Sequence, residues 1–222
     1  MKIYIGTSGW YYNWNKEKSL DWYIDNTGFN SIELNMSFYR FPYPNMVKSW
    51  AKKGKKLAWV IKVHRSITHH KKLNKGSFEI FQRFREIFRP LEKNIHYYLI
   101  QLPTGFKNIN AVEDFIDEFG YEKICIEFRD KSLFNKDIMT WGEKNKLLLV
   151  SIDAPKLPRI IMSRNIVYER IHGRNEWYKY NYSKQELSEI KKRTLKNKPK
   201  IVYFFLNNDY MFENGKLLKT ML

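Results

Sequence analysis

A short stretch near the middle of the chain, residues 124–130, alternates apolar and polar side chains. Period-two alternation is typical of a β-strand, because successive side chains point to opposite faces. One face of this predicted strand is apolar, whereas the other carries Cys125, Glu127 and Arg129. Charged side chains are seldom buried unless they are paired or used, so the pair at the end of this strand indicates a functional or ion-paired interior.

The same pattern recurs along the chain and predicts eight strands: Ile3–Ser8, Ser31–Asn35, Leu57–His64, Tyr97–Leu102, Ile124–Asp130, Leu147–Asp153, Val167–His172 and Ile201–Asn207. Between most of them lie helical patterns, over Trp22–Asn26, Asn45–Lys53, Ser77–Lys93, Asn110–Phe119, Ser132–Asn145 and Ser183–Leu195. No helical pattern is present between Pro155 and Asn165.

Strands that alternate with helices predict βαβ units and a parallel sheet, hence an α/β fold. Eight such units favour a TIM (β/α)₈ barrel with a degenerate sixth helix, formed by one domain over residues 1–222. A doubly wound open sheet is the alternative, but the first strand is not followed by the glycine-rich fingerprint of that fold.

In a barrel the apolar faces pack outward against the helices, and the other faces line the lumen. The polar residues near the carboxyl ends of the predicted strands then converge on one mouth, where barrel enzymes keep their sites. These residues are Ser8, Glu33, Asn35, Lys62, His64, Gln101, Glu127, Arg129, Asp153, Arg170, His172 and Asn207.

Composition limits the class of protein and its location. Forty Lys and Arg against 23 Asp and Glu give a net charge of +17, which favours anionic ligands such as phosphates or nucleic acid. A codon bias that enriches lysine explains the same charge without any ligand. No signal-peptide or membrane-spanning pattern is present, and Cys125 is the single cysteine; we therefore expect a cytoplasmic protein with no membrane partner.

Ordered motifs spread over most of the chain resemble the domain-of-unknown-function 72 (YecE-like) family. They comprise Ile5-Gly6-Thr7-Ser8-Gly9-Trp10, Ile32-Glu33-Leu34-Asn35, Lys62 with Ile67-Thr68-His69, Gln101-Leu102-Pro103, Glu127-Phe128-Arg129, Asp153-Ala154-Pro155, Arg170-Ile171-His172-Gly173 and Asn207-Asn208. The resemblance implies a TIM barrel and a site at these motifs. It implies no reaction, because the family has none that is settled.

The mouth residues suit acid/base chemistry on an anion. We expect catalytic roles for Glu127, Glu33, Asp153, His172 and His69, because carboxylates and imidazoles transfer protons near neutral pH. We expect substrate binding by Ser8, Asn35, Lys62, Gln101, Arg129, Arg170 and Asn207, because guanidinium, ammonium and amide groups hold phosphate or carboxylate oxygens. The alternative is a structural plug in which three acids simply pair with three bases.

A divalent metal is a further alternative, with Glu127, Asp153 and His172 as ligands. The adjacent arginines disfavour it, and we predict no cofactor. The sequence thus predicts an uncharacterised enzyme, of hydrolase, lyase or isomerase type, acting on an anionic, phosphate-bearing substrate. The rivals are a nucleic-acid-binding or nuclease-like protein and a non-catalytic barrel that binds a phosphate ligand.

Basic runs fall at both ends of the predicted barrel. Lys71, Lys72 and Lys75 follow a strand and would rim the mouth with nearby aromatic side chains, an arrangement that also suits nucleic acid. Lys52, Lys53, Lys55 and Lys56, and the run Lys191–Arg193, precede strands and are expected to be solvated surface at the opposite end. The oligomeric state is not predicted.

Overall fold

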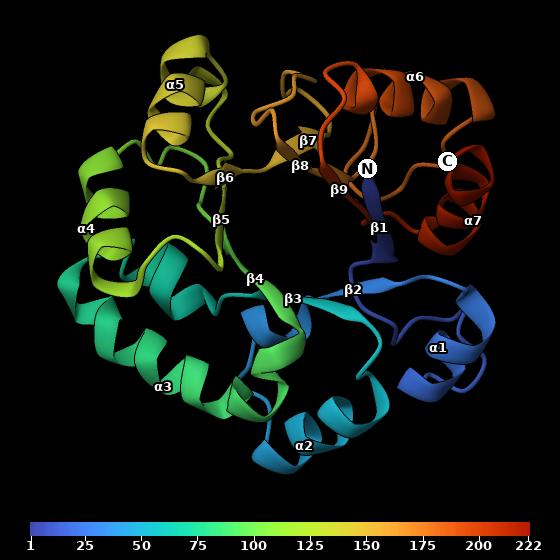
Figure 1. Cartoon of the computed structure of the whole chain (residues 1–222), viewed down its shortest axis with the longest axis horizontal. Helices are drawn as coiled ribbons and strands as arrows, with labels where there is room; N and C mark the ends of the chain where they lie inside the picture. Colours follow the sequence, from blue (N-terminus) through green and yellow to red (C-terminus); the bar gives the residue numbers. More distant parts are fainter.

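The computed structural model describes residues 1–222 and arranges parallel strands in a ring surrounded by helices (Figure 1). The strands are β1 (Lys2–Thr7), β2 (Ser31–Leu34), β3 (Ala58–Lys62), β4 (Ile95–Gln101), β5 (Ile124–Glu127), β6 (Leu148–Leu149), β7 (Ser151–Asp153), β8 (Ile166–Ile171) and β9 (Ile201–Leu206). Because only Val150 separates β6 from β7, these two occupy one strand position. The α/β barrel architecture is therefore confirmed, with eight positions around the ring.

Helices cover the outer face of the ring (Figure 1): α1 (Leu20–Thr27), α2 (Pro44–Lys53), α3 (Phe78–Phe88), α4 (Ile109–Phe119), α5 (Lys136–Lys144), α6 (Lys184–Leu195) and α7 (Met211–Met221). No helix lies between β7 and β8, which confirms the degenerate sixth helix. The sequence did not predict α7, whose pattern is interrupted by Gly215. That glycine lies against Phe29, whose ring would be 2.7 Å from an added Cβ.

Backbone hydrogen bonds divide the ring into two sheets, ordered β1-β9-β8-β7 and β2-β3-β4-β5-β6. At the β1–β2 boundary, side chains replace the missing ladder. The Asn30 side chain accepts from Ile5 N at 2.8 Å and donates to Ile3 O at 2.9 Å. The Tyr23 hydroxyl accepts from Thr7 N and donates to Ser31 O. These bridges satisfy the backbone groups that adjacent strands would otherwise pair directly.

The two strands at this boundary approach closely at Gly6. A Cβ on this residue would lie 2.1 Å from the carbonyl oxygen of Ser31, so only glycine is accommodated. The other boundary is covalent, since β6 and β7 are consecutive. There the Val150 amide donates to Ile126 O at 2.8 Å, and the Ser163 hydroxyl bonds both backbone groups of Leu149.

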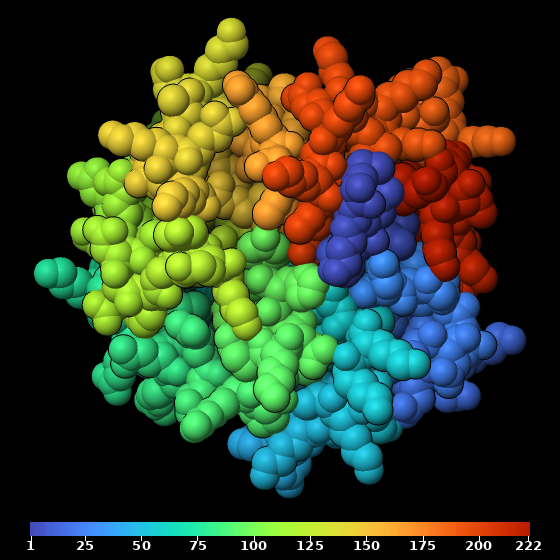
Figure 2. Space-filling view, in the orientation of Figure 1, coloured from blue at the N-terminus to red at the C-terminus, as the bar shows by residue number.

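Tyrosines fill the amino-terminal half of the lumen. Tyr203 stacks on Tyr4 with centroids 4.8 Å apart, contacts Tyr97 and Tyr168, and bonds His96 Nδ1 at 2.7 Å through its hydroxyl. Side chains also close the middle of the face seen in Figure 2, where dark blue residues at the start of β1 adjoin green residues from the middle of the chain. The lumen is therefore a packed core, as expected for this fold, and polar chemistry is confined to the mouth.

Local signals explain where the helices start. Ser19 caps α1, and Ser183 forms a capping box with Glu186 at the start of α6; such caps satisfy amides that lack helical partners.

None of the helices combines the length and the apolar character needed to cross a bilayer.

Candidate active site at the barrel mouth

Arg170 lies at the centre of the mouth and is completely buried. It extends from β8 across the lumen, and its Nε donates to Glu33 Oε2 on β2 at 2.9 Å. Its Nη1 donates to Glu127 on β5. One guanidinium therefore joins two buried carboxylates from different parts of the barrel, as bidentate geometry allows.

The first of these carboxylates, Glu33, is held by two further donors. The hydroxyl of Ser8, directly after β1, donates to Oε1 at 2.6 Å, and that of Tyr168 on β8 donates to Oε2 at 2.6 Å. With Arg170 added, both oxygens of Glu33 are fully engaged. Glu33 is thus a fixed part of the mouth wall, and neither of its oxygens is free to accept a substrate proton.

The second carboxylate, Glu127, also pairs with Arg129, two residues further along the chain. Burial alone would raise the pKa of Glu127, but the cations Arg129, Arg170 and Lys62 together lower it. Arg129 also reaches Gln101 Oε1 at 3.4 Å, and its guanidinium stacks 4.6 Å from the centroid of Trp177. Arg129 thus connects the buried network to the open part of the mouth.

His172 follows β8 and is completely buried. Burial, followed by the charges of Arg170 and Arg129, lowers its pKa well below the ordinary value, so the ring is neutral. Arg129 Nη2 lies 3.3 Å from Nε2 and can only donate. This contact assigns the proton to Nδ1, which has no partner within the protein. His172 therefore offers an unused donor near the mouth.

Lys62, at the end of β3, differs from every other cation of the mouth. The residue is 7% exposed, and its ammonium makes no ion pair and lies 4.3 Å from the centroid of the Phe38 ring. Burial, then repulsion by Arg170, lowers the pKa of Lys62 to about 7. Near neutral pH this lysine therefore exists in both the ammonium and the free amine form.

A pocket of about 520 Å³ lies at the edge of this network, where Gln101 and Arg129 form part of its wall. It is lined by His69, Gln101, Pro103, Thr104, Arg129, Trp177 and Tyr178. His69 lies in a single π-helical turn after β3 and packs edge-on against Phe38, the ring beneath Lys62. Burial, followed by the charge of Lys62, lowers the pKa of His69 to about 4, so its ring is a neutral proton acceptor at physiological pH.

The last two predicted binding residues, Asn35 and Asn207, directly follow β2 and β9. Asn35 has a buried side-chain oxygen without a partner, and Asn207 is 8% exposed. The carboxyl ends of seven strand positions therefore contribute to one mouth, as the alternation indicated. The contacts bring Ser8, Glu33, Gln101, Glu127, Arg129, Arg170 and His172 into one connected network.

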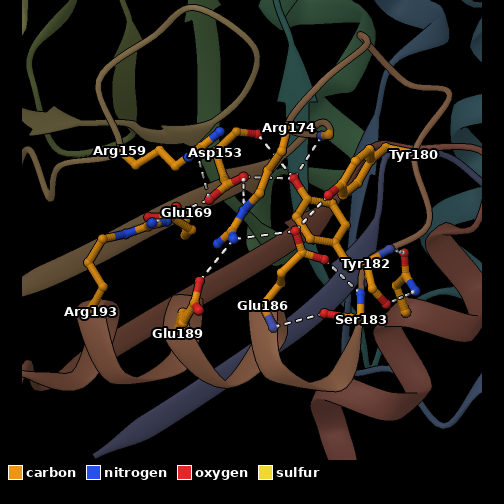
Figure 3. Close-up of polar contacts among 12 residues, drawn as sticks. Asp153, Arg159, Glu169, Arg174, Tyr180, Tyr182, Ser183, Glu186, Glu189 and Arg193 are labelled. Carbon is orange, nitrogen blue, oxygen red and sulfur yellow. Dashed lines mark hydrogen bonds and ion pairs between the residues drawn. The ribbon is translucent and has the colours of Figure 1, made fainter.

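The expected position of Asp153 is wrong. In the β7–β8 register Ile152, not Asp153, lies beside the inward-pointing Arg170. Asp153 instead faces the helix layer, where it accepts from Tyr182 at 2.8 Å and from Arg193 of α6 at 3.2 Å (Figure 3). The side chains of β6 and β7 that point into the lumen are apolar. The hydrogen-bonding partners of the Asp153 side chain lie outside the barrel wall, on α6 and the loop before it. Asp153 cannot therefore act in the mouth.

Glu169 lies beside Asp153 on the outer face of β8 and completes a second buried cluster (Figure 3). It pairs with Arg193, which the sequence analysis assigned to solvated surface but whose side chain is only 19% exposed. Burial raises the pKa of Glu169 to about 7, an effect that the attraction of Arg193 reduces. Arg174 links Asp153 to Glu186 and Glu189 of α6. This outer cluster fastens α6 to the barrel.

The candidate metal set is dispersed for the same reason, because Asp153 points away from Glu127 and His172. Across residues 1–222, no three or more His, Cys, Asp or Glu side chains are arranged to hold a metal ion. A pocket of about 750 Å³ lies at the amino ends of β6 and β8, away from the mouth. Two of its charged residues, Arg164 and Glu143, pair with each other.

Because Asp153 does not lie in the mouth, the charges there are not the three acids and three bases that the sequence predicted. Two carboxylates, Glu33 and Glu127, face two permanent guanidinium groups, Arg129 and Arg170, and these four pair with one another. Lys62 is left as a surplus cation when it is protonated. The mouth is therefore electrostatically complementary to one added negative charge.

Alternation places Tyr168 on the same face as Arg170 and His172, but Tyr168 was not among the expected site residues. Glu169, on the opposite face of this strand, was not identified as a structural polar residue. A signal for Glu169 did exist on α6, where Arg193 stands three residues after the buried Ile190 and must face the barrel. An arginine that points from a covering helix toward the barrel needs a carboxylate partner on the outer face of a strand, because an unpaired buried charge destabilises the fold.

Comparisons with known proteins agree with this fold. The family model described as "Protein of unknown function DUF72" matches residues 4–221. A crystal structure of a DUF72 family protein from Thermotoga maritima is 27% identical, with a TM-score of 0.84 over 100% of this chain and 99% of that one. One from Enterococcus faecalis is 22% identical, with a TM-score of 0.85 over 99% and 97%. None of the curated proteins matches the chain.

Proposed function

The chain belongs to the DUF72 family of proteins of unknown function, and from the geometry of its barrel mouth we propose that it is an enzyme. Its substrate is a small anion that carries a phosphate or carboxylate group, and its chemistry is proton transfer of the lyase or isomerase type. A cytoplasmic location, expected from the sequence, fits the use of soluble phosphorylated metabolites.

The surplus cation Lys62 carries this proposal. A buried ion pair that served only stability would match its charges, because an unpaired buried charge destabilises the folded state. Here one ammonium has no carboxylate partner, although Glu33 and Glu127 are near enough to influence its pKa. An anionic substrate would supply the missing charge.

The groups around the pocket divide into binding and proton transfer. Arg129 and Gln101 line the pocket wall and offer N–H donors to substrate oxygens. His69 is a neutral acceptor at the same pocket, and Lys62 gains or loses a proton near pH 7. A pKa close to the working pH is the condition for efficient general acid–base catalysis.

Titration calorimetry with glycerol 3-phosphate tests the anion site. Lys62→Met is expected to weaken binding by roughly tenfold or more, because hydrogen bonds to charged groups contribute roughly 1.5–3 kcal/mol. Lys52→Met, on the exposed surface of α2 at the opposite end, is the matched control and should bind like the wild type. Unchanged binding by Lys62→Met would contradict the proposed anion site.

A second candidate ligand is single-stranded nucleic acid, favoured by exposed tyrosines in loops that follow strands. Tyr11, Tyr39 and Tyr178 are 72%, 64% and 44% exposed, and bases stack on such rings. A triple alanine variant should lose affinity for a fluorescent DNA oligonucleotide if this candidate holds. If glycerol 3-phosphate binds and the oligonucleotide does not, the small-molecule function is retained.

A further inference from the structure

We propose that Lys62 forms a covalent Schiff base with the carbonyl carbon of an anionic aldehyde or ketone. This inference rests on the proposed anion site and names the substrate class that it serves. The site would then act on phosphorylated or carboxylated carbonyl compounds, with the lysine as nucleophile.

The surroundings of Lys62 suit a nucleophile better than a permanent charge. It is the only lysine among the buried residues of the chain, and its ammonium lies over an aromatic ring instead of against a carboxylate. Desolvation without an acid partner favours the free amine, the form that attacks a carbonyl. Its lowered pKa, about 7, agrees with this position.

Charge alone does not require a lysine here. Arg129 and Arg170 already supply permanent cations to the mouth, and a third arginine would bind an anion more strongly through two parallel donors. Only an amine can form a carbon–nitrogen double bond. Lys62 is 7% exposed and does not itself line the pocket, so a substrate reaches its amine past the lining residues His69 and Arg129.

The chemistry balances without a cofactor. The lone pair of the Lys62 amine attacks the carbonyl carbon, and the proton that the attacking nitrogen gives up passes to the carbonyl oxygen, which yields a neutral carbinolamine. A second proton converts that hydroxyl into water, which leaves as the C=N bond forms. The protonated imine then draws electrons from an adjacent C–H or C–C bond, whose proton or carbon fragment departs.

Neighbouring groups provide the required proton transfers. His69 lines the pocket and packs edge-on against the Phe38 ring that Lys62 also contacts, and burial, then the charge of Lys62, keeps its imidazole neutral by lowering its pKa. Glu127 is ionised and held by Arg129 and Arg170, so its charge stabilises the positive imine. We therefore assign proton transfer to His69 and electrostatic stabilisation to Glu127.

Borohydride trapping tests the Schiff base directly. The full-length protein is incubated with dihydroxyacetone phosphate, glyceraldehyde 3-phosphate or pyruvate, reduced with sodium borohydride, and analysed by peptide mass spectrometry. With at least one compound, Lys62 should gain the mass of that compound less one oxygen atom. Absence of this adduct on Lys62 with all three compounds would overturn the proposal.

Two variants and one ligand separate this proposal from the proposed function. Lys62→Arg keeps the cation but cannot form an imine, so it should give no adduct at residue 62. Lys52→Met should give the same Lys62 adduct as the wild type. If glycerol 3-phosphate binds but nothing is trapped, the Schiff base is refuted and the anion site stands. If neither binding nor trapping occurs, both proposals fail.

Discussion

Two buried charged clusters lie on opposite faces of the same strand, β8. On the inner face, Arg170 joins Glu33 and Glu127 across the lumen. On the outer face, one residue earlier, Glu169 pairs with Arg193 of α6 beside Asp153. Both clusters contain fully buried acids that pair with arginines, yet they differ in what surrounds them.

The outer cluster draws its partners from a covering helix and the preceding loop, and most of them are long side chains partly open to solvent (Figure 3). Water can therefore compensate when a partner is lost. The inner cluster is closed to solvent except at the pocket, and its surplus cation has no acid partner. The number of ion pairs in a buried cluster therefore does not identify a binding or catalytic site. A buried charge without a partner near a pocket does.

The largest effect is expected for Arg170→Met. Removal of this guanidinium leaves Glu33 and Glu127 as buried carboxylates without their shared partner, and breaking a buried pair costs about 3–5 kcal/mol. Urea unfolding should show a loss of that size. Arg174→Met in the outer cluster is the comparison, and an equal or larger loss there would contradict the distinction between the clusters.

Asp153→Asn should have a smaller effect on stability and none on ligand binding. The amide still accepts a hydrogen bond from Tyr182, while Arg159, Arg174 and Arg193 lose a partner in a partly solvated setting. We expect a loss of about 1–3 kcal/mol in urea unfolding and unchanged affinity for glycerol 3-phosphate. If this variant lost affinity for glycerol 3-phosphate but kept normal stability, Asp153 would have to be part of the ligand site.

The two clusters should respond to pH in opposite directions. The pKa of Lys62 falls from 10.5 to about 7 on folding, so the unfolded chain binds more protons between these values and stability rises with pH there. The pKa of Glu169 rises from 4.5 to about 7, so the folded chain binds more protons and stability falls with pH in that window. Each slope reaches at most about 1.4 kcal/mol per pH unit.

Differences between wild type and single variants isolate these contributions. Stability relative to Lys62→Met should rise only above about pH 7, and stability relative to Glu169→Gln should fall only below it. Urea unfolding from pH 4.5 to 10 provides the measurement. A flat difference curve for Lys62→Met would show that this lysine titrates normally.

The smallest effects are expected from surface lysines. Replacing Lys71, Lys72 and Lys75 by Gln removes charge near the mouth and should weaken glycerol 3-phosphate binding by less than about threefold at physiological salt, because exposed charges are screened over roughly 8 Å. Replacing Lys52, Lys53, Lys55 and Lys56 should change nothing. If both sets of substitutions weakened binding equally, the net positive charge would reflect overall composition and would have no specific role at the mouth.

Alternation was sufficient to predict much of the mouth. In the strand at residues 124–130 a clear period of two placed Glu127 and Arg129 on the lumen face, and the same argument placed Lys62 and Arg170 there. The structure has these residues on that face. Local sequence carries this information because side-chain direction in a strand depends only on residue parity once one face is known.

The prediction of side-chain direction was wrong in the strand that shows no alternation of apolar and polar residues. Residues 147–150 form the continuous apolar run Leu147-Leu148-Leu149-Val150, which gives no period, and a shift of one residue moves every side chain to the other face. Pairing with β8 decides that Ile152 faces the lumen and Asp153 faces α6. Local patterns were therefore enough to predict the alternating strands and most of the polar mouth. They could not predict that Asp153 faces α6, that Arg193 is buried, or that Lys62 has no acid partner, because ion pairing depends on neighbours far apart in the chain.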